Sequence, residues 1–452
     1  MAVLACGSAQ AQSARQTPVD AFIPEPMPPS VRVVQTELDG PLFADAAGKV
    51  FYIWPAKGQR VGRTGDEMGK APNCEDTVIK VSAGTMPPYP AGLELPEADT
   101  RPACTQVWPP FLAANDSKPV GQWNIVSRAN GSKQWTYEGY PVYTSALDRE
   151  AAAPVGSARI RAKGDSGNLR EPIGPLADVP AQFVVVSSQT GRFLARVDGP
   201  VVYTSDKDAP NKSNCDKACL GEWQPVLAAM AAPQSRGEWG VIERSPGVRQ
   251  WTFRKMPVYT RIADSVDDKY RPHGFDGSDK PGWHIAYVRL GPNIPKGFSI
   301  QDTTRGQVVA DPQGRTVYTH ACIDDAADMQ PCDHPNQTQA YRYAVCGHSD
   351  PVRCVKNFPY VIAEKGAKSD NKTWSVVSID PASGKFAAPG QAGALNVWAF
   401  RDRPIYTFIR DKAPGDLEGD AWGEMNGFRN GFHAIWMRDQ FGLFNEETRR
   451  DQ

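Results

Sequence analysis

The sequence lacks an excess of either charge, and it lacks a long apolar run. Fifty Lys and Arg residues stand against 51 Asp and Glu residues, which gives a formal net charge of -1 at pH 7. Because no basic stripe interrupts this balance, we do not expect nucleic acid as a partner. No apolar run approaches the ~20 residues of a membrane-spanning helix, so we expect no transmembrane segment.

The common signatures of catalysis are also missing. The chain contains no Gly-x-Ser-x-Gly motif and no Walker or Rossmann glycine motif. No two cysteines are spaced as Cys-x-x-Cys, which argues against a zinc ribbon, a thioredoxin-type redox site and c-type haem. We therefore assign no catalytic residue and favour a protein that is not an enzyme.

The first eleven residues are typical of the end of a signal peptide. Residues 1–6 are mostly apolar, and Ala9-Gln10-Ala11 has the small-x-small pattern that precedes a signal-peptidase cut, here ahead of Gln12. A second interpretation makes Cys6 a lipid-modified cysteine, which would give the chain a lipid anchor. A third is a disordered cytosolic tail. We favour export, and therefore a periplasmic, outer-membrane-associated or secreted bacterial protein.

Aromatic residues recur with fixed spacing and define an internal repeat. A Trp is followed after eight residues by a Tyr, and the Tyr is followed after five residues by an Asp. The three copies are Trp135, Tyr143 and Asp148; Trp251, Tyr259 and Asp264; and Trp398, Tyr406 and Asp411. Upstream of each copy a Gly-x-x-apolar-Tyr element ends at Tyr52, Tyr203 or Tyr318, and Asp208 follows Tyr203 by five residues. Each of three units would thus contain two related Tyr hairpins.

The second unit shows how one hairpin should form. Residues 250–253 alternate polar and large apolar side chains, which predicts a strand with one buried face. A turn at residues 254–257 leads to a second strand that begins at Pro257, where no ladder hydrogen bond is lost. We expect Trp251 and Tyr259 to meet across this hairpin, and the Asp five residues after each Tyr to cap the next turn.

The predicted fold class is all-β, with three tandem antiparallel β-repeat domains, each of two Tyr/Trp hairpin half-repeats, stapled by disulfides. The expected segments are a signal-peptide remnant (1–11), a Pro-rich extended lead (12–38), unit one (39–150), a linker (151–180), unit two (181–289), a second linker (290–296), unit three (297–440) and a charged tail (441–452). Three units in tandem would form an extended rod or arc.

Apart from Cys6, the cysteines are an even set of eight, which is typical of structural disulfides in an oxidising compartment. Cys104, Cys219 and Cys354 share one repeat position, four residues before an aromatic residue. Pairing each with the nearest upstream cysteine predicts the bridges Cys74–Cys104, Cys215–Cys219 and Cys346–Cys354, and leaves Cys322 with Cys332. Eight cysteines allow many other pairings, so this prediction depends on the repeat alone.

The pattern resembles a family of secreted bacterial repeats and predicted lipoproteins with a Tyr-x-aromatic-x-x-Asp motif, called the secreted repeat of unknown function. Residues 406–411, Tyr-Thr-Phe-Ile-Arg-Asp, match that motif. The copies at Tyr143 and Tyr259 keep the Asp spacing but lack the central aromatic residue, and units two and three end similarly, at His284 and His433. The resemblance covers most of residues 39–440 and implies an exported protein with no assigned activity.

Histidines and acidic loops are the candidates for metal binding. Copper or zinc would bind near the extra cysteines of unit three, and calcium would bind in one of two loops, at 206–214 or at 411–420. The candidate ligands are His320, His334, His348, Asp206, Asp208, Asp416 and Asp420. Neither loop matches an EF-hand, so we favour solvated turns, and no cofactor is firmly implied.

We favour a non-catalytic protein of the cell envelope that acts as a binding or scaffold module, with an envelope protein or a glycan as its partner. Two alternatives stay open. One is a metal-binding or redox-accessory periplasmic protein that uses the His and Asp residues of unit three. The other is an envelope hydrolase whose site lacks a known motif.

Overall fold

The computed structural model describes residues 20–56, 65–78, 101–156, 170–264, 280–303, 306–322, 330–423 and 431–437. These residues form several antiparallel sheets with four short helices and four disulfides, so the predicted all-β, disulfide-stapled fold class is confirmed. None of the described helices is long and apolar enough to cross a membrane.

The elements follow one another in a similar order in each unit. Unit one contains β1 (Arg32–Gln35), β2 (Pro41–Ala44), β3 (Tyr52–Ile53), α1 (Cys104–Val107), β4 (Trp123–Ser127), β5 (Lys133–Tyr137), β6 (Tyr140–Tyr143) and β7 (Glu171–Pro172). Unit two contains β8 (Phe183–Ser188), β9 (Gly191–Arg196), β10 (Tyr203–Ser205), α2 (Lys217–Leu220), β11 (Trp223–Pro225), β12 (Ser235–Arg236), β13 (Trp239–Ser245), β14 (Val248–Phe253), β15 (Met256–Pro257), β16 (Tyr259–Arg261), β17 (Trp283–Ile285) and β18 (Tyr287–Leu290). Unit three contains β19 (Ser299–Thr303), β20 (Gly306–Ala310), β21 (Tyr318–Ala321), α3 (Ala340–Gly347), α4 (Pro351–Asn357), β22 (Trp374–Ile379), β23 (Leu395–Phe400), β24 (Arg403–Tyr406) and β25 (Gly431–Ala434).

Two strands extend beyond the predicted unit boundaries. Strand β1 lies in the range predicted as a lead, and β7 lies in the range predicted as a linker. Both were missed because the sequence boundaries were drawn from the Tyr and Trp positions, and neither strand carries one. Each strand pairs with a strand of unit one, β1 with β2 and β7 with β3.

The two tyrosines of each unit face one another at the centre of the sheet. Strand register pairs Tyr52 with Tyr143, Tyr203 with Tyr259, and Tyr318 with Tyr406. Units one and three have the same strand order around this pair, β4-β5-β6-β3-β7 and β22-β23-β24-β21-β25. The half-repeats therefore meet tyrosine to tyrosine, which the sequence spacing had not revealed.

The predicted meeting of Trp251 and Tyr259 is wrong by one residue. In the β14–β15 hairpin Thr252 pairs with Pro257, so Trp251 lies opposite Val258 and not opposite Tyr259. A shift of one residue moves a strand side chain to the other face of the sheet. Trp251 accordingly packs in a cluster with Trp239, while Tyr259 packs in a second cluster with Tyr203.

This separation of Trp and Tyr divides each unit into two buried layers. The Trp pairs of units one, two and three lie in one kind of cluster, namely Trp123 with Trp135, Trp239 with Trp251, and Trp374 with Trp398. The Tyr pairs lie in the other kind, together with the aromatic residue that follows the second cysteine, Trp108, Trp223 or Phe358. Alternation along the strands thus gives each unit a Trp layer and a Tyr layer.

The four predicted disulfides are confirmed. The bridges join Cys74 to Cys104, Cys215 to Cys219, Cys322 to Cys332, and Cys346 to Cys354, with Cα–Cα distances of 5.3, 5.2, 4.9 and 4.6 Å. These distances lie in the ordinary range for a disulfide. Repeat position alone was therefore enough to choose among the possible pairings.

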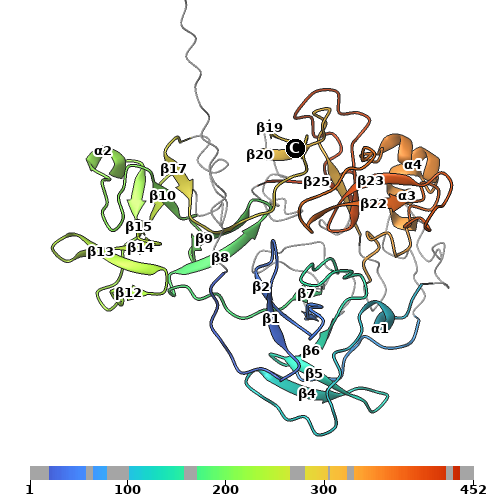
Figure 1. Cartoon of the computed structure of the whole chain (residues 1–452), viewed down its shortest axis with the longest axis horizontal. Coiled ribbons are helices and arrows are strands. Elements are labelled where there is room, and N and C mark those ends of the chain that lie inside the picture. Colours follow the sequence, from blue (N-terminus) through green and yellow to red (C-terminus); the bar gives the residue numbers. More distant parts are fainter. Residues whose placement is uncertain are drawn as a thin grey trace, which may run out of the picture.

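The units are grouped around a centre, so the expected rod or arc is wrong (Figure 1). The tip of the β1–β2 hairpin of unit one reaches into unit three. Its Leu38 is buried in the Trp layer of unit three, among residues such as Phe298 and Trp374. Glu37 accepts hydrogen bonds from the backbone N–H and the hydroxyl of Thr373, at 2.8 and 2.6 Å.

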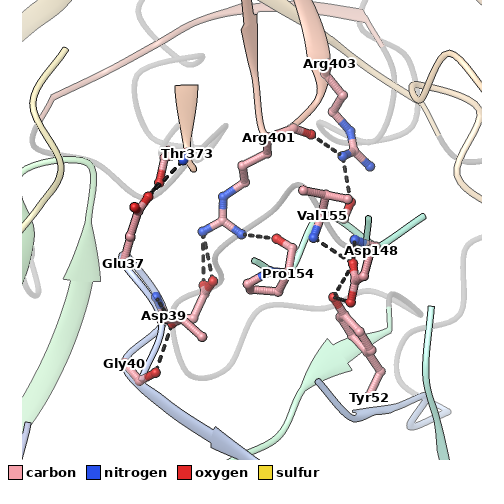
Figure 2. Close-up of polar contacts among 12 residues, drawn as sticks. Glu37, Asp39, Gly40, Tyr52, Asp148, Pro154, Val155, Thr373, Arg401 and Arg403 are labelled. Carbon is pink, nitrogen blue, oxygen red and sulfur yellow. Dashed lines mark hydrogen bonds and ion pairs between the residues drawn. The ribbon is translucent and has the colours of Figure 1, made fainter. Parts of the chain in front are cut away.

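Two arginines of unit three complete this junction (Figure 2). Arg401 donates to both carboxylate oxygens of Asp39 at 3.1 Å and to the carbonyl of Pro154 at 3.3 Å. Arg403 donates to the carbonyl of Val155 at 2.7 Å. Both guanidinium groups are buried, so they fix unit three against two separate segments of unit one.

Unit two contacts the same hairpin tip at Gly40. The guanidinium of Arg192 in β9 packs on Gly40 so closely that an added Cβ would lie 1.4 Å from one of its nitrogen atoms. Gly40 also has a φ of +76°, which other residues rarely adopt. One five-residue turn, residues 36–40, therefore meets both other units.

Replacing Leu38 by Ala should lower the free energy of unfolding by about 2–5 kcal/mol, because it leaves a cavity in the Trp layer of unit three. Chemical denaturation followed by Trp fluorescence measures the change. Leu112→Ala is the matched control, since Leu112 is 53 % exposed and its loss should cost about 0.5 kcal/mol or less. Equal costs for the two variants would contradict the junction.

Candidate functional site

Each Asp of the repeat binds the tyrosine of the opposite half-repeat. Tyr52 donates to Asp148 at 3.0–3.1 Å, Tyr203 to Asp264 at 3.1 Å, and Tyr318 to Asp411 at 2.6 Å. In all three pairs the phenol comes from the first hairpin and the carboxylate from the second. The Tyr/Asp motif is therefore one partner of a hydrogen bond between hairpins.

The reverse pair exists in units one and two. Tyr259 donates to Asp208 at 2.7 Å, and Tyr143 donates to Asp66 at 2.8 Å. Asp208 was predicted, but Asp66 was missed because it follows its Tyr by fourteen residues and not by five. In unit three Tyr406 lies beside Arg342, whose guanidinium carbon is 5.4 Å from the centre of the Tyr406 ring. Asp324, which follows Tyr318 by six residues and not by the five of the repeat, lies outside the described residues.

Three of the repeat aspartates, Asp148, Asp208 and Asp411, also cap turns, as predicted. Asp148 accepts from the backbone N–H groups of Val155 and Gly156 at 2.8 and 2.9 Å (Figure 2). Asp411 accepts from the backbone N–H of Glu418 at 3.0 Å, and Asp208 accepts from that of Asn214. Each of these carboxylates thus holds both a tyrosine and the backbone of the segment that follows it.

Burial makes these carboxyl groups unusually basic. Loss of water raises the pKa of Asp66, Asp148 and Asp411 to about 6, although hydrogen bonds from their Tyr partners oppose the rise. Burial and the facing carboxylate likewise raise the pKa of Tyr52 and Tyr143 well above the usual range. Tyrosines of this kind remain protonated donors at neutral pH.

A second matched contact lies beside each Tyr pair. In units two and three the aromatic residue four positions after the second cysteine stacks against a residue of the strand that pairs with the first Tyr strand. That strand is β17 in unit two and β25 in unit three. The ring pairs are Trp223 with Trp283, 3.8 Å apart and 6° from parallel, and Phe358 with Phe432, 3.7 Å apart and 12° from parallel. In unit one the guanidinium of Arg170 lies 4.6 Å from the centre of the Trp108 ring. A cation therefore occupies the position that an aromatic ring occupies in the other units.

Segment length decides how well this stack is covered. Trp108 follows Tyr52 by 56 residues and Phe358 follows Tyr318 by 40, whereas Trp223 follows Tyr203 by only 20. In unit three helices α3 and α4 lie in the longer segment (Figure 1). In unit two the Cys215–Cys219 bridge spans just four positions. The Tyr layer of unit two is therefore the least covered of the three.

Unit two consequently presents polar and aromatic groups at the surface. Trp283 is partly exposed, whereas its counterpart Phe432 is fully buried. The side chain of His284 is 46 % exposed and its Nε2 lies 3.0 Å from a carboxylate oxygen of Asp206. His433 lies at the same register position, opposite Thr319 as His284 lies opposite Thr204, and is fully buried. The predicted equivalence of the two histidines is confirmed.

Behind this surface lies a chain of hydrogen bonds that ties the disulfide to the sheet. Ser213 lies 2.7 Å from the hydroxyl of Tyr259, and Arg244 donates to Ser213. Arg244 also donates to Gln250 at 2.8 Å and to the carbonyl of Cys215 at 2.9 Å. The open face, which we define as Asp206, Asp208, Ser213, Trp283 and His284, is therefore tied through Arg244 to the disulfide and to the buried Gln250, and directly to the buried Tyr259.

The same arginine and glutamine recur in unit one. Arg128 donates to Gln134 at 2.6 Å and to the carbonyl of Cys74 at 2.9 Å. In unit three Ile379 and Val397 occupy the corresponding positions, and they pack in the core. Sequence reasoning missed this pair, although the Gln before the Trp in units one and two was a visible signal.

The structure does not bring the candidate metal ligands together. Within the described ranges no group of three or more His, Cys, Asp or Glu side chains is arranged to hold a metal ion. His320 is buried in β21 against Phe432, and His348 ends α3 at the surface. His334 is fully buried, and burial, with Arg403 and Arg149 nearby, holds its pKa well below the usual range. These three histidines therefore form no common site.

The acidic loops are turns. Asp416 accepts from the backbone N–H groups of Lys412 and Ala413 at 2.7 and 2.8 Å, which lower its pKa. Asp420 accepts from the backbone N–H of Ala434 at 2.9 Å. In the other loop Asp206 faces His284, while Asp208 is engaged by Tyr259. The carboxylates hold backbone and side-chain donors in the way that solvated turns predict.

Compared with known proteins, the chain matches no family model, no curated protein and no solved structure. Its function must therefore be argued from the arrangement of its own residues.

The stability of the protein should fall as pH rises through 6. The folded chain binds the Asp148 proton more tightly than the unfolded chain, because the pKa is raised from 3.8 to about 6. This contribution is complete below the unfolded pKa and is lost as pH passes the folded pKa; its size is on the order of 2 kcal/mol. Thermal unfolding between pH 4.5 and 8 measures it.

Asp148→Asn should remove the Asp148 share of this pH dependence and leave the shares of Asp66 and Asp411, because the amide cannot titrate but keeps an oxygen for Val155 and Gly156. Asp148→Ala leaves those buried donors unpaired and should cost about 1–3 kcal/mol at every pH. Asp116→Asn, at an exposed position, is the control and should leave the slope as it is. A slope as steep in Asp148→Asn as in the wild-type chain would show that Asp148 does not contribute to it.

Proposed function

We propose that the chain is a non-catalytic binding module of the bacterial cell envelope, and that the open face of unit two engages an envelope glycan. The proposal rests on one observation, namely that residues at matching positions of the three units differ in their exposure to solvent. The residue that packs on the aromatic ring after the second cysteine is buried in units one and three, as Arg170 and Phe432. In unit two the matching Trp283 is partly exposed, and so is the neighbouring His284. A side chain such as Trp283, which is exposed in one unit while the matching side chains of the other two units are buried, is suited to recognition.

The chemistry of the open face suits a sugar. The indole of Trp283 offers a flat apolar surface and is held by its stack on Trp223. Asp206 and His284 supply an acceptor and a second polar group close by, and Asp208 adds another carboxylate. Flat aromatic surface with a few placed polar groups is the usual composition of a site for small polar ligands.

Compartment and architecture support the same proposal. Four disulfides favour an oxidising compartment, as does the resemblance to secreted repeats at residues 406–411. The hairpin tip at residues 36–40 contacts units two and three, so the open face is carried on a unit that packs against its neighbours. A surface on a packed support needs little further ordering of its side chains when a ligand binds.

Co-sedimentation with purified envelope sacculi tests the proposal. The wild-type chain should pellet with sacculi, and Trp283→Ala should reduce the affinity about tenfold or more, since it removes the aromatic surface. Met230→Ala is the control, because Met230 is 73 % exposed in the same unit but lies outside the open face. Circular dichroism verifies that each variant is folded.

Retention that Trp283→Ala leaves unchanged would contradict the role of the open face. Absence of retention, together with a crosslinked protein partner that is lost in Trp283→Ala, would keep the binding module and replace the glycan by a protein. Turnover of envelope substrates would contradict the non-catalytic assignment.

A further inference from the structure

We infer that a cavity beside the Trp layer of unit two binds a small uncharged molecule that joins an apolar or aromatic body to a carboxamide-type head. The centre of a water-sized molecule can occupy about 80 Å³ of it, within about 500 Å³ of space between atoms that includes open solvent. Its lining strands, among them β8, β9, β13, β14 and β18, belong to other sheets than the one that carries the open face. The inference is therefore independent of the proposed function.

The floor of the cavity is apolar. Val185 of β8, Trp239 of β13, Phe253 of β14 and Val288 of β18 line it. Trp239 and Phe253 stand 5.1 Å apart, centre to centre, and form an aromatic corner. Apolar and aromatic walls with few polar groups are typical of a ligand site.

The roof is made by the segment that precedes β1. Phe22 pairs with Ala177 in an antiparallel bridge, and Asp178 donates a backbone hydrogen bond to the carbonyl of Ala21 at 3.1 Å. Arg236, from the wall, forms an ion pair with the side chain of Asp178. Two short stretches of chain, held by a few bonds, therefore separate the apolar floor from solvent.

The charges that line the cavity are mutually neutralised. Asp20 pairs with Arg192, Asp178 pairs with Arg236, and Glu238 pairs with Arg254 just outside the cavity. A charged ligand would therefore lose its hydration without gaining a free counter-charge. The lining selects an uncharged molecule.

The Asp20–Arg192 pair also supplies a specific polar contact. Both residues line the cavity, and they are 4 % and 8 % exposed. Within the part of the chain that the structure describes, neither Oδ1 of Asp20 nor Nε of Arg192 has a hydrogen-bond partner. One is an acceptor and the other a donor, so together they match a group that both donates and accepts. A carboxamide is such a group, and its N–H and C=O would satisfy the two buried atoms.

Titration of the full chain with phenylacetamide tests the inference, and phenylacetate serves as the charged isostere. Trp fluorescence and saturation-transfer NMR report binding. We expect saturable binding of phenylacetamide, and binding of phenylacetate weaker by about tenfold or more because its head is charged. Equal affinity for the two molecules, or no saturation up to about 10 mM phenylacetamide, would overturn the inference.

Val288→Phe fills the cavity and should weaken phenylacetamide binding about tenfold or more. Leu290→Phe is the matched control on the same strand, since Leu290 is 56 % exposed, and it should change the affinity less than about twofold. Binding that survives in Val288→Phe would place the ligand elsewhere. If Val288→Phe fails to fold, the comparison of phenylacetamide with phenylacetate on the wild-type chain decides alone.

Discussion

The hydrogen bond from each first-hairpin tyrosine to the Asp of the second hairpin organises its unit. Because the two tyrosines are neighbours in the sheet, the bond joins hairpins that lie far apart in sequence, as with Tyr52 and Asp148. The same Asp then holds the backbone that follows it. A single buried carboxylate thereby fixes the position of one hairpin, one strand end and one connecting segment, and an unpaired polar group there would be costly.

That connecting segment links the interior of unit one to its neighbour. Asp148 holds the N–H groups of Val155 and Gly156, while the carbonyls of Pro154 and Val155 receive Arg401 and Arg403. The Arg401–Asp402 turn has positive φ angles of 47° and 61°, which are unfavourable for residues other than glycine. Its ion pairs with Asp39 and Arg149 of unit one offset that strain. The equivalent turn of unit two, Arg254–Lys255, also has positive φ angles, of 49° and 69°, so this conformation belongs to the hairpin and the junction makes use of it.

Sequence reasoning found what depends on short-range pattern. Strand alternation, the Trp, Tyr and Asp spacing and the position of each second cysteine sufficed for the fold class and for all four disulfides. It failed on the length of one turn and where position depends on long-range pairing. The β14–β15 register was wrong by one residue because a turn of two residues, Arg254 and Lys255, is shorter than the turn assumed. Asp66 was missed because its distance from Tyr52 is set by a segment of irregular length, and Leu38 because its core belongs to another unit.

Differences between the units follow from what fills the space above the Tyr layer. Unit one places Arg170 against Trp108 there, and unit three places α3, α4 and the buried Arg342, which contacts the rings of Tyr343, Tyr360 and Tyr406. Both solutions bury a guanidinium against aromatic faces, which compensates its lost hydration in part. Unit two has the shortest segment and cannot build such a cover, so its ring stack remains partly in water. Units one and three, whose sheets share one strand order, thus enclose the contact beside the Tyr pair. Unit two, with a different strand order and the shortest segment, leaves Trp283 partly exposed.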